Sequence, residues 1–119
     1  MSYTEHNGYY PDGTIKSHCF IKNGKTHGTM QQWNEKGKLV YDGYYREGFE
    51  EGIHRQFYAN GLLYTERTYK RGLLNGISKQ WYSNGRIEAK EWYVQGKLHG
   101  KQYYWTETGK ISSVAVHQV

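Results

Sequence analysis

The sequence predicts an all-β fold, an antiparallel meander built from 24-residue β-hairpin repeats. Glycine, aromatic and aliphatic residues each recur at this spacing, and the register is kept without an insertion along most of the chain. Such a register is typical of repeat proteins, which bind partners over an extended surface. Three glycine columns are expected to form structural turns: Gly13, Gly37, Gly61, Gly85 and Gly109; Gly24, Gly48, Gly72 and Gly96; and Gly28, Gly52, Gly76 and Gly100.

The candidate core is aromatic. The chain has 13 tyrosines and a mean hydropathy of −0.98, so aliphatic residues alone supply little apolar area. Side chains two apart on a strand share a face, and the recurring aromatics can therefore pack as ladders along the sheet. The predicted structural core consists of Trp33, Phe57, Trp81, Trp105, Tyr45, Tyr69 and Tyr93, with Ile15, Leu39, Leu63, Ile87 and Ile111 in an accompanying aliphatic column.

Two kinds of link separate the predicted strands. Asn60-Gly61 lies between two β-prone runs, and Asn-Gly is a strong hairpin signal because both residues tolerate positive φ. A second link, Gly72-x-x-x-Gly76, leads into the next repeat. We expect strands near 14–21, 29–34, 38–45, 53–58, 62–69, 77–82, 86–93, 101–106 and 110–116, with a further one near 4–10. Ten strands about 4.8 Å apart predict a length of roughly 45 Å.

One domain spanning 1–119 is expected, with repeats starting near 9, 33, 57 and 81 and a partial capping repeat at 105–119. The sequence contains no apolar run long enough for a transmembrane helix and no signal-peptide pattern, and Cys19 is its single cysteine. These features predict a cytoplasmic location, in a bacterium or in an infected host cell.

Trp81-Tyr-Ser-Asn-Gly-Arg-Ile and Trp92-Tyr-Val-Gln-Gly-Lys-Leu-His-Gly resemble the bacterial variant of the MORN repeat, found in antitoxins of the YwqK type. The resemblance covers about Tyr9 to Ile111 and implies a single-layer, twisted antiparallel β-meander, elongated along the repeat axis. It also implies a member that neutralises a toxin by direct binding. Thr4 replaces a glycine of the pattern, and the segment after Ile111 departs from it, so both ends are interpreted as caps.

No catalytic, metal or cofactor site is predicted. His27 and His99 recur at one repeat position, but Glu51 and Asn75 occupy it in the other copies, which indicates a turn residue that bonds to local backbone. Cys19 follows His18 on a strand, so the two side chains point to opposite faces and form no nucleophile–base pair. Asn23-Gly24-Lys25-Thr26 lacks the earlier glycine of a phosphate-binding loop. We therefore expect a protein that is not an enzyme.

The candidate partner-binding residues are charged or aromatic. The four repeats carry formal charges of +2, −1, +3 and +2 within a total of +5, an unevenness that favours a protein partner over a polyanion. Tyr and Arg are enriched at interface hot spots, and an acidic loop in the second repeat suits a basic partner. The candidates are Glu50, Glu51, Arg55, Tyr58, Lys79, Tyr82 and Tyr103.

Three functions follow from these features. The first is a non-enzymatic protein-binding module, an antitoxin- or immunity-like inhibitor that occludes a partner such as a toxin or effector enzyme. The alternative is a binder of anionic surfaces, RNA or phospholipid, through its basic repeats. The third is a self-assembling scaffold in which the segment around Val114 pairs two edge strands in a homodimer, an arrangement that Val114→Lys would convert to a monomer.

Overall fold

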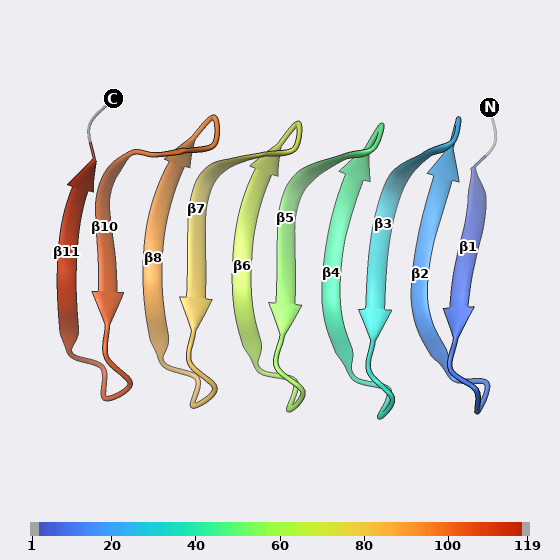
Figure 1. Cartoon of the computed structure of the whole chain (residues 1–119), viewed down its shortest axis with the longest axis horizontal. Helices are drawn as coiled ribbons and strands as arrows, with labels where there is room; N and C mark the ends of the chain where they lie inside the picture. Colours follow the sequence, from blue (N-terminus) through green and yellow to red (C-terminus); the bar gives the residue numbers. More distant parts are fainter. Residues whose placement is uncertain (1–2, 118–119) are drawn as a thin grey trace.

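The computed structural model describes residues 3–117, which form one open antiparallel sheet of eleven strands (Figure 1). Sequential strands are neighbours except at the short β9, which pairs with β8 as β10 does, so the chain is a simple meander. The predicted fold class is confirmed. The short segments 1–2 and 118–119 of the expected domain lie outside the described residues. The strands are β1 Thr4–Tyr9, β2 Ile15–Lys22, β3 Lys25–Trp33, β4 Leu39–Arg46, β5 Phe49–Phe57, β6 Leu63–Lys70, β7 Leu73–Trp81, β8 Ile87–Val94, β9 Lys97–Leu98, β10 Gly100–Trp105 and β11 Ile111–His117.

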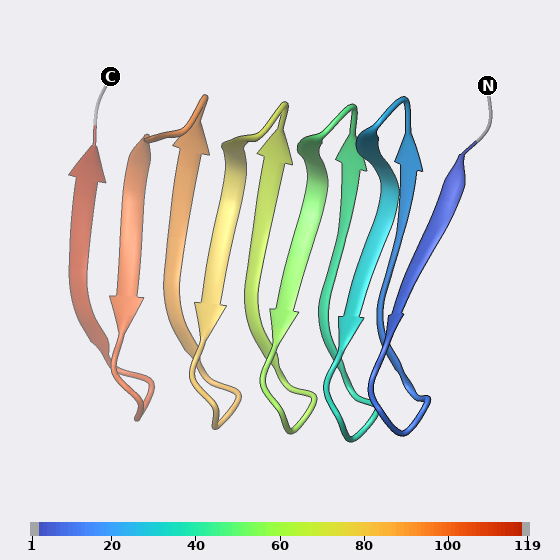
Figure 2. The same cartoon turned by 45° about the vertical axis from the view of Figure 1, so that its right-hand side comes forward.

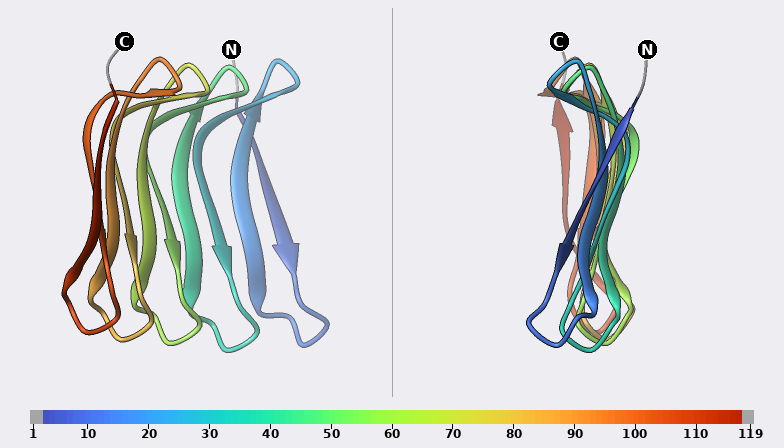
Figure 3. Two further views of the ribbon diagram at one scale, coloured as in Figure 1. Left: turned by 60° about the vertical axis from the view of Figure 1, so that its left-hand side comes forward. Right: turned by 90° about the vertical axis from the view of Figure 1, so that its right-hand side faces the viewer.

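The sheet is a single layer. Its principal extents are 45 × 33 × 13 Å, and the long dimension equals the length expected from the strand spacing. Seen edge-on, the strands lie in one bowed layer and β1 crosses the others obliquely (Figure 3). Within residues 3–117, β11 pairs only with β10, so a homodimer through this strand stays a prediction. The same residues contain no helix long and apolar enough to cross a membrane.

The links between strands lie along the two sides of the sheet on which strands begin and end, which we call its two edges. One of these edges carries loops of five residues (Figure 2). In the loop after β5, the Gly61 N–H donates to the Tyr58 carbonyl (2.9 Å) and the Tyr58 N–H donates to the Leu62 carbonyl (2.8 Å). Gly61 has a φ of 89°, whereas Asn60 is not among the residues with positive φ; its side-chain oxygen accepts from the Leu62 N–H (2.9 Å). Asn-Gly therefore marks a turn here, but only the glycine uses the left-handed region.

The opposite edge carries the tight two-residue turns. Arg71 and Gly72 both have positive φ, 51° and 81°, as do the equivalent pairs in the other repeats. The next strand starts at once, so β3, β5 and β7 begin four residues earlier than predicted. The second glycine of the link is not a turn residue: Gly76 lies inside β7, at a bulge where the register shifts opposite Thr68. The expectation that this whole link is a turn was wrong, because glycine also accommodates a bulge.

The core differs from the prediction. The predicted aromatic core residues are all half-buried, and the most buried side chains are small or polar: His54, Thr65, Ser78, Ala89 and Gln102. A single layer has no second sheet to cover large side chains, whereas a small residue in mid-sheet is shielded by its larger neighbours. Gln102 is fully buried and uses its amide to bond the Trp92 N–H and the His99 and Gly100 carbonyls.

Recurrent hydrogen bonds tie each repeat to the next. The Gly72 N–H donates to the Glu50 carbonyl (2.9 Å), and Gly48 and Gly96 do the same in their repeats. One residue earlier, the Arg71 N–H donates to a Glu51 carboxylate oxygen (3.2 Å). At the other edge, tyrosine hydroxyls donate to carbonyls 23 residues ahead. The sheet is therefore stabilised along both edges as well as by its ladder.

Candidate functional site

The two faces of the sheet are chemically different. We name them after two adjacent residues of β5, the His54 face and the Arg55 face, since successive strand residues point to opposite sides. Cross-strand pairing extends each assignment to neighbouring strands, because paired residues share a face. A site on this protein therefore belongs to one face or the other.

The His54 face has a satisfied polar centre. His54 Nε2 lies 2.7 Å from the Tyr44 carbonyl, which can only accept, so Nε2 carries the hydrogen. His54 Nδ1 then accepts from the Tyr41 hydroxyl (2.5 Å), which contacts the Tyr45 hydroxyl at 3.1 Å. Burial, followed by the hydrogen bond with Tyr45, raises the pKa of Tyr41. Gly43 makes room for this cluster: a Cβ there would lie 2.3 Å from His54 Nδ1.

A hollow of about 320 Å³ opens beside this cluster. Its lining includes the Tyr45 and Tyr69 rings, Glu50 and Arg67. The phenol groups of Tyr41 and Tyr45 and the imidazole of His54 are bonded to one another, so they serve to hold the centre of this face together. Glu50 and Arg67 line the same hollow and take no part in these hydrogen bonds.

A charged row crosses the Arg55 face. Its members are successive cross-strand partners: Asp42, Arg55, Glu66, Lys79, Lys90 and Tyr103. Arg55 Nε donates to Glu66 Oε2 at 2.9 Å, one of the two ion pairs among residues 3–117. The row is thus charged along most of its length and ends at an aromatic side chain.

Aromatic rings border the basic end of the row. Trp92 and Tyr103 lie 6.1 Å apart edge to face, and Tyr103 stacks on Trp105 at 5.9 Å. Lys90 Nζ lies 5.1 Å from the centre of the Trp92 ring, a cation–π contact. Since Tyr103 shares the face of Lys90 and stacks on Trp105, the tryptophan column lies on the Arg55 face, opposite the tyrosine column of Tyr45, Tyr69 and Tyr93.

Exposed apolar side chains gather on the Arg55 face, toward the edge with the two-residue turns. We name this set the apolar patch. The exposed fractions of these side chains range from 38% for Ile77 to 55% for Phe49. Contiguous exposed apolar surface of this kind marks interaction sites. The apolar patch consists of Tyr44, Phe49, Ile53, Leu73, Ile77 and Val94.

Charged residues surround the apolar patch. Beside Phe49 is an open hollow of about 520 Å³, lined by Arg46, Lys70 and Arg71 together with two glutamates. Over β6–β10 the Arg55 face carries far more cations than anions. It holds the acid Glu66 and the lysines at 70, 79, 90, 97 and 101. The result is an apolar centre with a mainly basic rim.

The structure brings together some of the predicted partner-binding residues. Arg55, Lys79 and Tyr103 share the charged row. Glu51 lies on the same face and is used by the Arg71 turn, whereas Glu50 lines the hollow on the His54 face. The two remaining tyrosines use their hydroxyls within the fold: Tyr58 bonds the Trp81 carbonyl and Tyr82 bonds the Trp105 carbonyl.

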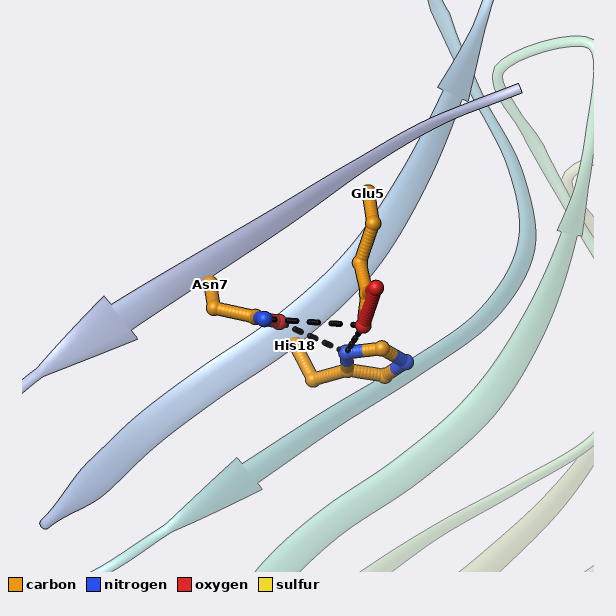
Figure 4. A network of polar contacts seen from close by, with 3 residues as sticks. All are labelled: Glu5, Asn7 and His18. Carbon is orange, nitrogen blue, oxygen red and sulfur yellow. Dashed lines mark hydrogen bonds and ion pairs between the residues drawn. The ribbon is translucent and has the colours of Figure 1, made fainter. Parts of the chain in front are cut away.

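His27 and His18 have structural contacts. His27 Nδ1 accepts from the Glu47 N–H (3.1 Å), the same interaction that Asn75 makes with the Gln95 N–H, so this repeat position supports the turn of the following repeat. His18 Nδ1 lies 2.7 Å from Asn7 Oδ1 and 3.3 Å from Glu5 Oε1, which links β2 to β1 (Figure 4). Among residues 3–117, no three His, Cys, Asp or Glu side chains gather as a metal site.

Sequence reasoning missed the apolar patch. Ile53 and Ile77 directly follow the bulge glycines Gly52 and Gly76, a position that had been interpreted as a turn. The predicted strands 53–58 and 77–82 begin at these isoleucines and place them on the same face as Arg55 and Lys79. They were missed because only charged and aromatic residues were considered as partner-binding candidates.

The chain belongs to the family described as MORN repeat variant, whose model matches residues 26–47, 50–71 and 74–95, more than half of the chain. Each match covers one hairpin: β3–β4, β5–β6 or β7–β8. Such repeats are non-catalytic modules that generally bind proteins or membranes. No curated protein matches the chain.

Proposed function

We propose that this chain is a non-enzymatic protein-binding module that inhibits a partner protein by covering a functional surface with its Arg55 face, in the manner of an antitoxin or immunity protein. The observation that carries the proposal is the apolar patch with its charged rim. A hydrophobic centre within a polar rim is the usual anatomy of a protein interface.

The size of the sheet suits this role. A face of 45 × 33 Å offers roughly 1,500 Å², about twice the 800 Å² that a standard interface uses on each partner. Hydrogen bonds along both edges hold the face in a fixed shape, which reduces the ordering cost of binding. Occlusion requires only such a preformed surface and no catalytic group.

The basic rim indicates an acidic partner. Over β6–β10 the cations of the Arg55 face are offset by Glu66 alone among the row residues, so an acidic surface with an apolar centre is complementary to it. RNA would be attracted by the same cations, but it does not explain why the exposed aliphatic side chains Ile53 and Ile77 lie at the centre of the site. An anionic membrane would engage both features, but Glu47 and Glu51 beside the apolar patch oppose its approach and favour a protein.

The test is a comparative pull-down from the native cells, with salt-stepped elution. We expect wild type and the control Leu62→Asp, which changes an exposed apolar residue of a five-residue loop, to retain one protein at high salt. The double variant Ile53→Asp/Ile77→Asp should lose it. The retained protein should lose activity when the chain is added in equimolar amount.

Two results would contradict the proposal. In the first, wild type retains only nucleic acid or lipid, released at moderate salt, which assigns the basic repeats to anionic surfaces. In the second, the double variant retains the same protein as wild type, which places the interface elsewhere.

A further inference from the structure

The charges of the charged row alternate in sign from Asp42 to Lys79. Asp42 faces Arg55, and Glu66 lies between Arg55 and Lys79. The repeat column that holds Asp42 and Glu66 continues 24 residues later with Lys90, which is the cross-strand partner of Lys79. The acid that would complete the alternation is thus replaced by a second cation.

This replacement places two like charges directly opposite each other. Cross-strand partners have Cβ atoms about 4.5–5.5 Å apart, and like charges in this position destabilise a sheet. The nearby acids have other bonded partners: Glu66, which lies across from Lys79 on the other side, binds Arg55 at 2.9 Å, and Glu88 accepts from Gln80 at 2.9 Å. Neither Lys79 nor Lys90 has an ion-pair partner within 4.0 Å among residues 3–117.

Apolar surface borders the lysine pair. Lys79 and Lys90 are both half-buried, and Lys90 lies over the Trp92 ring. Ile77 of the apolar patch is the cross-strand partner of Trp92, so the patch and the pair are continuous. A carboxylate brought here by an apolar contact would meet two ammonium groups at a site partly shielded from water, where charge attraction is stronger than in bulk solvent.

We propose that Lys79 and Lys90 form the anchor for an Asp or Glu side chain of an acidic protein partner, next to an apolar contact on Ile77 and Trp92. The inference rests on the proposed function and specifies the chemistry of its partner. The carboxylate takes the place of the missing acid in the row and relieves the repulsion between the two lysines.

A single carboxylate suits the site better than a polyanion. A nucleic-acid strand needs a continuous basic track along its phosphates. Here Glu66 and Asp42 interrupt the row on one side, and Tyr103 and Val114 follow the lysines on the other. The pair is therefore a discrete positive site within a surface of mixed charge.

Lys90→Glu restores the alternation and separates binding from stability. We expect this variant to melt about 1–4 °C higher than Lys90→Gln, which loses the same cation–π contact with Trp92, because Glu at this position would face Lys79. Lys36→Glu, which makes the same charge change in an exposed loop, is the matched control and should leave the melting temperature within about 1 °C. A melting temperature for Lys90→Glu equal to or below that of Lys90→Gln would show that the two lysines do not repel each other and would overturn the proposal.

Binding is tested with the probe peptide acetyl-Glu-Phe-Glu-amide and its counterpart acetyl-Lys-Phe-Lys-amide, followed by ¹⁵N amide shifts of the full chain. We expect the acidic peptide to shift residues 77–79, 90–92 and 103, to bind Lys90→Glu at least about tenfold more weakly, and to bind Lys36→Glu as it binds wild type. Shifts spread over all lysine-bearing loops, or unchanged binding by Lys90→Glu, would overturn the proposal. Tighter binding of a uridine 12-mer than of the acidic peptide would overturn it in favour of nucleic acid.

Failure of this inference can be told apart from failure of the proposed function. If Lys90→Glu keeps the captured partner while Ile53→Asp/Ile77→Asp loses it, the Arg55 face binds a protein and the lysine pair is not its anchor. If wild type, Lys90→Glu and Ile53→Asp/Ile77→Asp all keep the same partner, that partner does not bind the Arg55 face.

Discussion

The hydroxyl of Tyr58 donates a 2.6 Å hydrogen bond to the backbone carbonyl of Trp81, which lies one repeat further along the chain. Tyr82 makes the same bond to Trp105 (2.6 Å), and Tyr10 makes it to Trp33 (2.7 Å). Each of these bonds joins a five-residue loop to the last residue of a strand in the next repeat, in addition to the strand ladder. They explain how an open, single-layer sheet with few buried side chains keeps a fixed shape.

Removing this hydroxyl should weaken the fold without changing it. We expect Tyr58→Phe to lower the free energy of unfolding by about 1 kcal/mol, because the ring contacts remain while a hydrogen bond is lost. Urea unfolding followed by tryptophan fluorescence measures the difference. The control is Tyr44→Phe, whose exposed ring lies on the apolar patch, and an equal loss in both variants would refute the special role of the Tyr58 hydroxyl.

Gly43 and His54 should be energetically coupled. A Cβ on Gly43 would lie 2.3 Å from His54 Nδ1 and 2.7 Å from the Tyr41 hydroxyl, so Gly43→Ala is expected to destabilise the chain by about 1–3 kcal/mol through overpacking. Denaturant unfolding of a double-mutant cycle checks the coupling.

The second arm of the cycle uses His54→Ser, which installs the residue that the next repeat has at Ser78. In this background Gly43→Ala should cost less than half as much, because the imidazole that it would contact is absent. Equal costs in both backgrounds would show that the glycine is required for another reason.

The Tyr104 hydroxyl should make stability depend on alkaline pH. Its hydrogen bond to Glu91 Oε2 (2.5 Å), followed by burial, raises the pKa of Tyr104 to about 12 from an ordinary value of 10.0. The folded state thus holds this proton more tightly than the unfolded state. The associated stability is fully present below pH 10 and is lost as the pH rises toward 12.

Tyr104→Phe should therefore reduce the loss of stability between pH 9 and pH 11, measured by urea unfolding at each pH. Tyr58→Phe provides a comparison with another tyrosine whose pKa is raised mainly by burial. A pH dependence identical to wild type in Tyr104→Phe would contradict the assignment.

Asparagine should stabilise both turn types, for different reasons. Arg71 holds a φ of 51°, which non-glycine residues other than Asn and Asp adopt reluctantly. Arg71→Asn should therefore stabilise the chain by up to about 1 kcal/mol. Asn60→Ala should instead destabilise it by about 1 kcal/mol, since the Asn60 side chain accepts from the Leu62 N–H. Thermal unfolding tests both, and a destabilised Arg71→Asn would contradict the turn assignment.

Periodicity was enough to predict the meander and its length. The Gly61 and Gly72 columns mark chain reversals at opposite edges, and two hairpin strands per repeat follow from their spacing. The exact strand starts were not available from this pattern, because glycine supplies positive φ at a turn such as Gly72 and at a bulge such as Gly76 alike. The pairing of Tyr69 with Leu74 shows that the chain has already reversed before Gly76, so Gly72 lies in the turn and Gly76 at the bulge.

The candidate site depends on differences between the repeats and on side-chain exposure, and the repeat pattern describes neither. Arg55, Lys79 and Tyr103 were recognisable because they share a column, and the structure places them in one row. Lys90 was missed because it departs from its column, in which the two preceding copies, Asp42 and Glu66, are acids. The exposure of Ile77 depends on the absence of a second layer, which residue spacing does not report.

The central claim is that the Arg55 face, and not the His54 face, contacts a protein partner. Site-specific photocrosslinking in the native cells tests it most directly, with p-benzoylphenylalanine placed at Ile77 on the Arg55 face or at Gln32, an exposed residue on the His54 face. We predict a single protein adduct from position 77 and none from position 32. The same adduct from position 32 with none from position 77 would contradict the account.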